Sequence, residues 1–171
     1  LKENFNCYGS FLSNEISKQQ MMSVKKPEAF KLYCNIYQPM VLMTSRQCLF
    51  HQVTGCEKYK MDDSCIQQCE KHSTITNLKN ETFIIEKTKG NYHSVYNAAN
   101  LLNTDVVADI PDLFSCFFID LSDIKTKTKI EMDKASIIKL FKNHLSGDSD
   151  STLQLQHIIH TSNNIQYKDG I

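Results

Sequence analysis

The stretch NFNCYGSFLSNEISKQQMMSVKKPEAFKLYCNIY, residues 4–37, decides the fold class of the chain. Apolar and small side chains alternate from Asn4 to Leu12, which indicates a strand. A short helix is predicted next, because Ser17 can cap its first turn and Gln20 can return the capping-box hydrogen bond. Alternation resumes in residues 28–37 and predicts a second strand. This order is typical of a right-handed parallel β-α-β unit.

A parallel β-α-β unit predicts an α/β fold, and here it suggests the closing part of a barrel or sheet. Such folds keep their chemistry in the loops at the carboxyl ends of the strands. Two loops, Ser10 to Glu15 and Thr44 to Cys48, are expected in that position.

The rest of the chain predicts further elements of both kinds. Residues 75–78 and 82–87 form a hairpin pattern that turns at residues 79–81, and residues 116–124 are an apolar run typical of a buried strand. A helix is expected from Thr104 or Asp105 to Leu113, and the clearest helix pattern spans residues 133–147. We therefore expect closing barrel strands in 1–44, a cysteine-rich module in 45–75, an α+β region in 76–146 and a loosely attached polar tail in 147–171.

Composition bounds the possible classes of protein. The 171 residues are 41% hydrophobic and 22% charged, as in ordinary globular proteins. Equal numbers of basic and acidic residues, 19 each, give no overall attraction to nucleic acid or membranes. Two local basic runs, 87–89 and KTKTK at 125–129, are interpreted as solvated surface. No apolar run approaches the about 20 residues that cross a bilayer. The chain begins without Met, so we expect a piece of a longer protein.

Four of the seven cysteines lie within RQCLFHQVTGCEKYKMDDSCIQQCEKH, residues 46–72, with the spacing C-x7-C-x8-C-x3-C. Their neighbours are polar, so core packing does not explain them, whereas the other three cysteines (Cys7, Cys34 and Cys116) sit in apolar strand patterns and are expected in the core. An odd number of cysteines and no visible signal peptide argue against a disulfide framework.

This spacing favours metal ligation. It does not decide between zinc and an iron–sulfur cluster. Only Cys65 and Cys69 form a close pair, and the longer gaps are loose for a structural zinc site. Four irregularly spaced thiolates suit an iron–sulfur cluster somewhat better. His51 and His72 are possible substitute ligands, and a nucleophilic pair of Cys48 with His51 is a weakly supported alternative.

Five motifs follow one another along the chain: LSNEIS (12–17), EAFKLYCNIYQP (28–39), VLMTSRQCLF (41–50), TNLKNETFIIEKTKGNYHSVYNAANLLN (76–103) and NNIQYKDGI (163–171). In this order they resemble the collagenase-like peptidase family, peptidase family U32, most strongly over residues 6–103. The chain departs from the family at Ile16, where leucine is usual, and at residues 79–81, which lack an aspartate–arginine pair.

The resemblance implies a fold and two alternative activities. It implies that the chain closes a TIM-like barrel whose earlier strands come from a missing N-terminal part of the same protein. Some branches of the family bind an iron–sulfur cluster through four cysteines and support oxygen-independent hydroxylation of RNA or of ubiquinone precursors. The family name implies instead a peptidase acting on protein, without a cluster. An inactive interaction module is a third possibility.

The resemblance also implies site residues and a location. Cys48, Cys56, Cys65 and Cys69 would bind a cluster, of the 4Fe-4S type, with zinc as the alternative. Glu15 and Arg46, at predicted strand ends, would be catalytic residues. The expected partners are RNA or a protein substrate and the rest of the same protein, without a membrane, in the cytoplasm.

Overall fold

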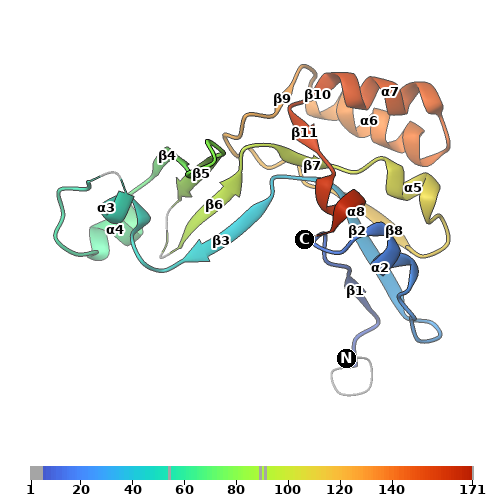
Figure 1. Cartoon of the computed structure of the whole chain (residues 1–171), viewed down its shortest axis with the longest axis horizontal. Helices are drawn as coiled ribbons and strands as arrows, with labels where there is room; N and C mark the ends of the chain where they lie inside the picture. Colours follow the sequence, from blue (N-terminus) through green and yellow to red (C-terminus); the bar gives the residue numbers. More distant parts are fainter. Residues whose placement is uncertain (1–5, 54, 89, 91, 171) are drawn as a thin grey trace. The chain divides into compact units, whose positions relative to one another are not determined.

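The computed structural model describes residues 6–53, 55–88, 90 and 92–170. It is a mixed α/β structure, as the β-α-β pattern predicts (Figure 1). The chain divides into two compact units. Unit 1 contains residues 1–38, 101–123 and 128–171, and unit 2 contains residues 39–100 and 124–127. Each unit has a hydrophobic core of its own.

Unit 1 combines a five-stranded sheet, a separate two-stranded sheet and several helices. Its strands are β1 (Gly9–Phe11), β2 (Lys31–Gln38), β7 (Asn100–Leu102), β8 (Cys116–Ile119), β9 (Lys129–Ile130), β10 (Ile159–His160) and β11 (Ser162–Asn163). Strands β9 and β10 form the two-stranded sheet. Its helices are α2 (Lys18–Met22), α5 (Asp105–Asp109), α6 (Lys134–Leu145), α7 (Ser149–Ile158) and α8 (Ile165–Asp169).

The predicted β-α-β unit is confirmed, because α2 joins β1 and β2, which are parallel. Ser17 and Gln20 make the capping box that the sequence indicates. Gly9 allows the close approach of β1 to β2, since a Cβ there would lie 2.7 Å from the carbonyl oxygen of Lys31. Asn4 and Phe5 of the predicted strand lie outside the described residues.

The sheet is organised around β2. Strand β8 is parallel to β2, β7 is antiparallel to it, and the order along the sheet is β1-β2-β7-β11. The side chains of Leu32, Cys34 and Ile36 alternate inward from β2 and are buried, as predicted. Within the described part of the chain this sheet is open and does not close into a barrel.

The expectation that residues 147–171 form a loosely attached tail is wrong for the residues that the structure describes. Helices α6 and α7 lie side by side (Figure 1). Leu155 of α7 and Ile159 of β10 are 0% exposed, and Tyr167 of α8 is also buried in the core of unit 1. A few apolar residues at the correct spacing therefore bind a segment of polar composition to the core.

Two other local predictions need correction. Residues 116–119 form β8 as a half-exposed strand, because only Phe117 and Ile119 pack on the core. Phe118 packs on the rings of Phe11 and Tyr33 and stays 42% exposed, and Cys116 is exposed. Helix α5 ends at Asp109, before Pro111, instead of reaching Leu113.

Unit 2 contains an antiparallel sheet and two short helices. The strands are β3 (Val41–Ser45), β4 (Lys71–Thr76), β5 (Thr82–Lys87) and β6 (His93–Asn97), in the order β3-β6-β5-β4. The helices are α3 (Leu49–Val53) and α4 (Asp63–Gln67). The predicted hairpin is confirmed as β4 and β5, and β5 has the predicted bounds, but the first strand covers 71–76 instead of 75–78. Leu49 and Phe50 of α3 pack on Ile85 and Val95 of the sheet, so α3 is anchored to the strands.

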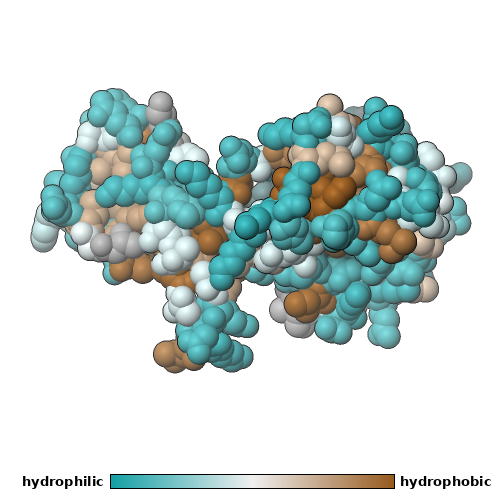
Figure 2. All heavy atoms as spheres, turned by 90° about the horizontal axis from the view of Figure 1, so that it is seen from above, coloured by the Kyte–Doolittle hydropathy of each residue, from teal (hydrophilic) through white to brown (hydrophobic). Residues whose placement is uncertain are grey.

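The loop expected at Thr44 to Cys48 starts later than predicted. Residues 41–45 are the antiparallel strand β3, so the loop follows β3 and not a parallel strand. Hydrophilic side chains cover much of the face seen in Figure 2, with hydrophobic side chains exposed in patches between them. No helix in the described ranges is long and apolar enough to span a bilayer.

Candidate functional site

A small cavity in unit 2 brings together three of the four clustered cysteines. Its volume is about 40 Å³, and its lining residues are Cys48, His51, Cys56, Lys58, Lys60, Met61 and Cys65. The lining therefore contains three thiols, a thioether and an imidazole, but no carboxylate. Soft sulfur and nitrogen donors of this kind select zinc or iron–sulfur clusters over magnesium and calcium.

Cys48 reaches the cavity from the residue before α3, and His93 holds the backbone around it. His93 is 0% exposed, and its Nδ1 atom lies 2.7 Å from the carbonyl oxygen of Gln47 and 3.1 Å from the backbone nitrogen of Leu49. Its ring also packs edge-on against Phe50, with 6.0 Å between centroids. One side chain on β6 therefore contacts the peptide groups on both sides of Cys48.

Cys56 lies between α3 and α4, next to a positive charge from the sheet. Its backbone nitrogen donates to the carbonyl oxygen of Phe50 at 3.3 Å. The ammonium of Lys71 on β4 lies 3.6 Å from the Cys56 sulfur. The pKa of Cys56 is lowered, first by a hydrogen bond from the backbone of Lys58 and then by the charge of Lys71. A lowered pKa increases the share of the thiolate, which is the form that binds metals and attacks electrophiles.

Cys65 is placed by the start of α4. Asp62 caps this helix by accepting a hydrogen bond from the Cys65 backbone nitrogen at 3.0 Å. Lys58 donates to both carboxylate oxygens of Asp62, at 2.9 and 2.8 Å, and also to Ser64. The hydrogen bonds from Lys58 and Ser64 hold the pKa of Asp62 well below its usual range. The cap and its lysine thus fix the backbone that carries the Cys65 thiol.

Cys69 follows α4 and is half-buried, but it does not line the cavity. Among the described residues, no three His, Cys, Asp or Glu side chains are arranged in advance as metal ligands. No disulfide joins the cysteines of this part of the chain either. Three predicted ligands therefore share one cavity, and Cys69 lies four residues beyond Cys65 along the chain.

The two predicted catalytic residues are exposed and belong to different units. Glu15, in unit 1, follows β1, and its backbone nitrogen donates to Ser13 at 3.2 Å. Arg46, in unit 2, follows β3, donates to the Tyr92 hydroxyl at 3.0 Å and lies over the Tyr92 ring. Neither side chain lines the cysteine cavity.

The three cysteines outside the cluster differ from one another in their exposure. Cys34 is buried in the core of unit 1, and burial raises the pKa of its thiol to about 12. Cys7 is half-buried and packs against the same core. Cys116 was expected in the core but is exposed, because its side of β8 faces away from the packed layer.

The sequence indicated the cysteines but not the residues that position them. His93 and Lys71 act from strands β6 and β4, 46 residues from Gln47 and 15 residues from Cys56 respectively. Only strand pairing brings these two side chains to the cavity. Their distance from the cysteines along the sequence therefore does not predict their role. Asp62 is the one positioning residue that the local sequence could indicate, because an aspartate directly before a short helix pattern is typical of a helix cap.

The fold and this site define a mixed α/β protein with a thiol-rich cavity on an antiparallel sheet. The family model described as Peptidase family U32 matches residues 4–169, which is nearly the whole chain of 171 residues. The chain therefore belongs to peptidase family U32, as the motifs indicated. Neither the curated proteins nor the solved structures include a match to this chain.

Proposed function

We propose that Cys48, Cys56, Cys65 and Cys69 bind an iron–sulfur cluster of the 4Fe-4S type. The observation that carries this proposal is the shared cavity, in which three thiols meet without any carboxylate. Lysines at the same place would compensate the negative charge of thiolates and sulfides. Lys71 contacts Cys56, and Lys58 and Lys60 line the cavity. Hydrogen bonds to the sulfurs are one of the protein's means of setting a cluster potential.

The size of the cavity sets a condition on this binding. A volume of about 40 Å³ is close to that of one water molecule in the liquid, about 30 Å³. The volume has room for a single ion, which keeps zinc as the alternative, but the thiols would have to move closer together, because no three side chains of the described residues are arranged as metal ligands. A cluster would require the chain around the cavity to move outward and Cys69 to turn inward. Helix α4 has only five residues, so little structure is lost by such a movement.

The test is a metal analysis of anaerobically purified protein. We expect iron and acid-labile sulfide in equal amounts, and a visible absorption band, all lost in Cys65→Ser and Cys69→Ser. The matched control is Cys116→Ser, because Cys116 is exposed and belongs to unit 1. If the analysis finds zinc but no sulfide, the site is a zinc site and not a cluster. If it finds neither iron nor zinc, metal binding is excluded.

For the complete protein we propose oxygen-independent hydroxylation of RNA, supported by the family and by the cluster proposal. The parallel strands β1, β2 and β8 would then belong to a TIM-like barrel completed by other strands of a longer protein. Mass spectrometry of RNA nucleosides, from cells with and without the gene, tests this activity. Loss of a hydroxylated pyrimidine is the expected result, and unchanged nucleosides would reject it.

One observation favours a second candidate, a peptidase without a cluster. The lowered pKa of Cys56 is a property of cysteine nucleophiles, and the Nδ1 atom of His51 lies 3.2 Å from the Cys56 carbonyl oxygen. Digestion of casein or gelatin by metal-free protein, abolished in Cys56→Ser but not in Cys116→Ser, would support it. Absence of digestion in a protein shown to be folded would reject it.

A further inference from the structure

We propose that Lys87 is a positioning residue of the cysteine cavity, which holds the segment that carries Cys65 and Cys69. Three contacts support this role: two hydrogen bonds of the Lys87 ammonium, and one hydrogen bond between the chain after β5 and helix α4. That the positioned sulfurs serve a metal rests on the function proposed above, whereas the positioning itself does not.

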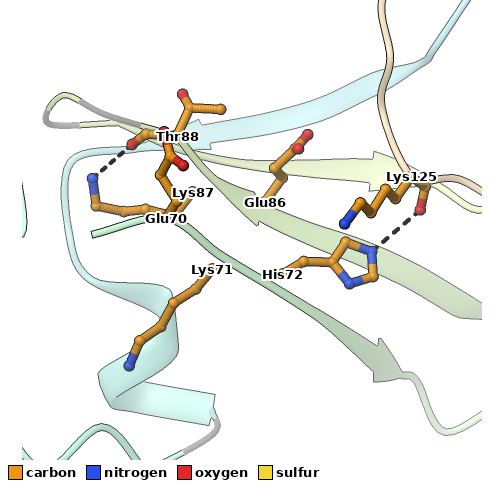
Figure 3. Close-up of a pocket in the computed structure, with 7 residues that line it drawn as sticks. All are labelled: Glu70, Lys71, His72, Glu86, Lys87, Thr88 and Lys125. Atoms are coloured by element: carbon orange, nitrogen blue, oxygen red, sulfur yellow. Dashed lines mark hydrogen bonds between the residues drawn. The ribbon is translucent and has the colours of Figure 1, made fainter. Parts of the chain in front are cut away.

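Lys87 lies at the end of β5 and is buried although it carries a charge. Its side chain is 2% exposed, so the interpretation of residues 87–89 as solvated surface is wrong for this lysine. Its ammonium donates to the carbonyl oxygen of Thr88 at 2.8 Å, as Figure 3 shows, and also to that of Gly90. Within the described part of the chain it forms no ion pair with a carboxylate within 4.0 Å. Lysines are rarely buried without an ion pair, so the two carbonyl groups account for its position.

The chain that Lys87 holds is in turn bound to helix α4. The backbone nitrogen of Gly90 donates to the carbonyl oxygen of Ile66 at 2.7 Å. Ile66 is the fourth of the five residues of α4, and the last four carbonyl groups of a helix have no partner within the helix. Gly90 therefore supplies a partner that α4 cannot supply itself.

These contacts connect the buried ammonium to the cysteine segment. Ile66 directly follows Cys65 and precedes Cys69 by three residues. A helix of five residues has little stability of its own, so contacts from outside decide whether it keeps its place. The thiol of Cys65 is 8% exposed, and we expect it to become accessible when the carboxyl end of α4 is released.

Lys87 is also the middle member of a row of three basic side chains across the sheet. Lys71 of β4 and His93 of β6 are its direct partners on the two neighbouring strands. Side chains that lie directly opposite each other on paired strands point to the same face of a sheet. The three side chains therefore lie on one face, and the next pair along β4 and β5, His72 and Glu86, points to the other face.

Each member of this row serves a different cysteine-bearing segment. Lys71 donates to the Cys56 sulfur at 3.6 Å, and His93 contacts the peptide groups on both sides of Cys48. Lys87 acts on the third segment, through the hydrogen bonds described above. One row of the sheet thus holds all three segments that contribute thiols to the cavity.

The experiment measures the alkylation rate of each cysteine in the reduced, metal-free full chain, by iodoacetamide labelling and peptide mass spectrometry. Lys87→Met keeps a long side chain and removes the ammonium. We expect it to raise the rate of Cys65 about tenfold, as for the loss of one charge-assisted hydrogen bond, and to leave Cys48 unchanged. The matched control is Lys79→Met, in the exposed turn between β4 and β5, which should change neither rate.

A second variant disturbs the same contact from its other side. Gly90→Ala keeps Lys87 but strains the backbone, because residue 90 has a φ of 114°. A Cβ there would meet no atom within 4 Å, so the strain comes from the backbone angle alone. We expect a selective rise in the rate of Cys65 here too. Cys34, which is buried in unit 1, reports global unfolding in every sample.

Titration with cobalt(II), followed by the visible absorption of its thiolate complexes, extends the test to metal binding. We expect Lys87→Met to bind cobalt about 10- to 100-fold more weakly than the wild type, which is the usual effect of losing a group that orients a metal ligand. Lys79→Met should bind as the wild type does. A wild type that binds no cobalt would contradict the proposed metal site, and the alkylation rates would still decide the role of Lys87.

The pattern of rates separates positioning from general stabilisation. A selective rise at Cys65 in both variants, with Cys34 unchanged, would support the proposal. An equal rise at all four clustered cysteines in Lys87→Met would mean that this lysine only stabilises unit 2 as a whole. An unchanged rate of Cys65 in both variants would also overturn the proposal. If Lys87→Met does not fold, Gly90→Ala alone decides.

Discussion

At the scale of single residues, a histidine holds the backbone on both sides of one cysteine of the cavity. His93 is buried beneath α3 and contacts the peptide groups before and after Cys48. A position of this kind is sensitive to substitution because a buried backbone group without a partner costs free energy.

We therefore predict the effect of two substitutions at His93. His93→Phe keeps a ring against Phe50 but removes both backbone contacts, and we expect the free energy of unfolding to fall by about 1–3 kcal/mol. His93→Asn keeps a polar group near the Nδ1 position and should lose less. Urea denaturation measures the stability, and alkylation followed by mass spectrometry measures the exposure of Cys48. Equal stability of the two variants would contradict the assigned role of the polar contacts.

At the scale of elements, α7 tests whether the C-terminal residues belong to the fold. Leu155 is 0% exposed and Leu153, on the same helix, is 65% exposed. We expect Leu155→Ala to lower the free energy of unfolding by about 2–5 kcal/mol, as for other buried leucines, and Leu153→Ala to change it little. Thermal and urea unfolding followed by circular dichroism provide the comparison. A similar, small effect of both substitutions would mean that α7 is only loosely attached.

The helix pair α6–α7 also predicts a pH dependence. His144 of α6 is buried, and its Nδ1 atom lies 2.7 Å from the Thr152 hydroxyl of α7. Burial lowers the pKa of His144 below its ordinary value of 6.5, although the nearby carboxylate of Asp105 opposes this. The unfolded chain therefore binds a proton before the folded chain does, and stability is lost as the pH falls below 6.5.

The measurement is the stability of the wild type and of His144→Gln, between pH 7.5 and 5. We expect the wild type to lose more stability than the variant over this range. The control is His72→Gln, because His72 is exposed. If the wild type and His144→Gln respond identically to pH, the imidazole of His144 does not titrate as the structure requires.

The elements also show which features a sequence can predict. The Ser17–Gln20 capping box and α6 depend on neighbours within one helical turn, so both were predicted and confirmed. The burial of Leu155 depends on packing against residues far away in the sequence. Its neighbours in the sequence are polar, so the sequence did not predict this burial. The cysteines of the site were recognised by type and spacing, whereas His93 and Lys71 required knowledge of which strands pair.

At the scale of the whole molecule, unit 2 is inserted into a hairpin of unit 1. Gln38 of β2 and Leu101 of β7 are antiparallel partners, and the chain between them builds most of unit 2. All buried residues of the larger core belong to unit 1, and all those of the smaller core belong to unit 2. The two units should therefore be separable.

We predict that unit 1 folds when residues 39–100 are replaced by an Asn-Gly turn. A two-residue turn suits the antiparallel pair that precedes it, because type I′ turns match the twist of such strands. Circular dichroism and cooperative thermal unfolding would show the fold. The matched control carries Leu155→Ala in the shortened chain, which should be destabilised as in the full chain. Aggregated or non-cooperative protein would show that the larger core depends on unit 2.

The inserted position of unit 2 also sets the order in which the protein is completed during translation. Every buried residue of the smaller core, and all four clustered cysteines, have been synthesised once the ribosome has passed residue 100. The larger core still lacks Leu155, Ile159 and Tyr167 at that moment. Since chain segments fold as they emerge, the cysteine segment could bind the metal proposed above while unit 1 is still unfinished. Metal binding would then begin in the middle of the nascent chain, before the core of unit 1 has formed.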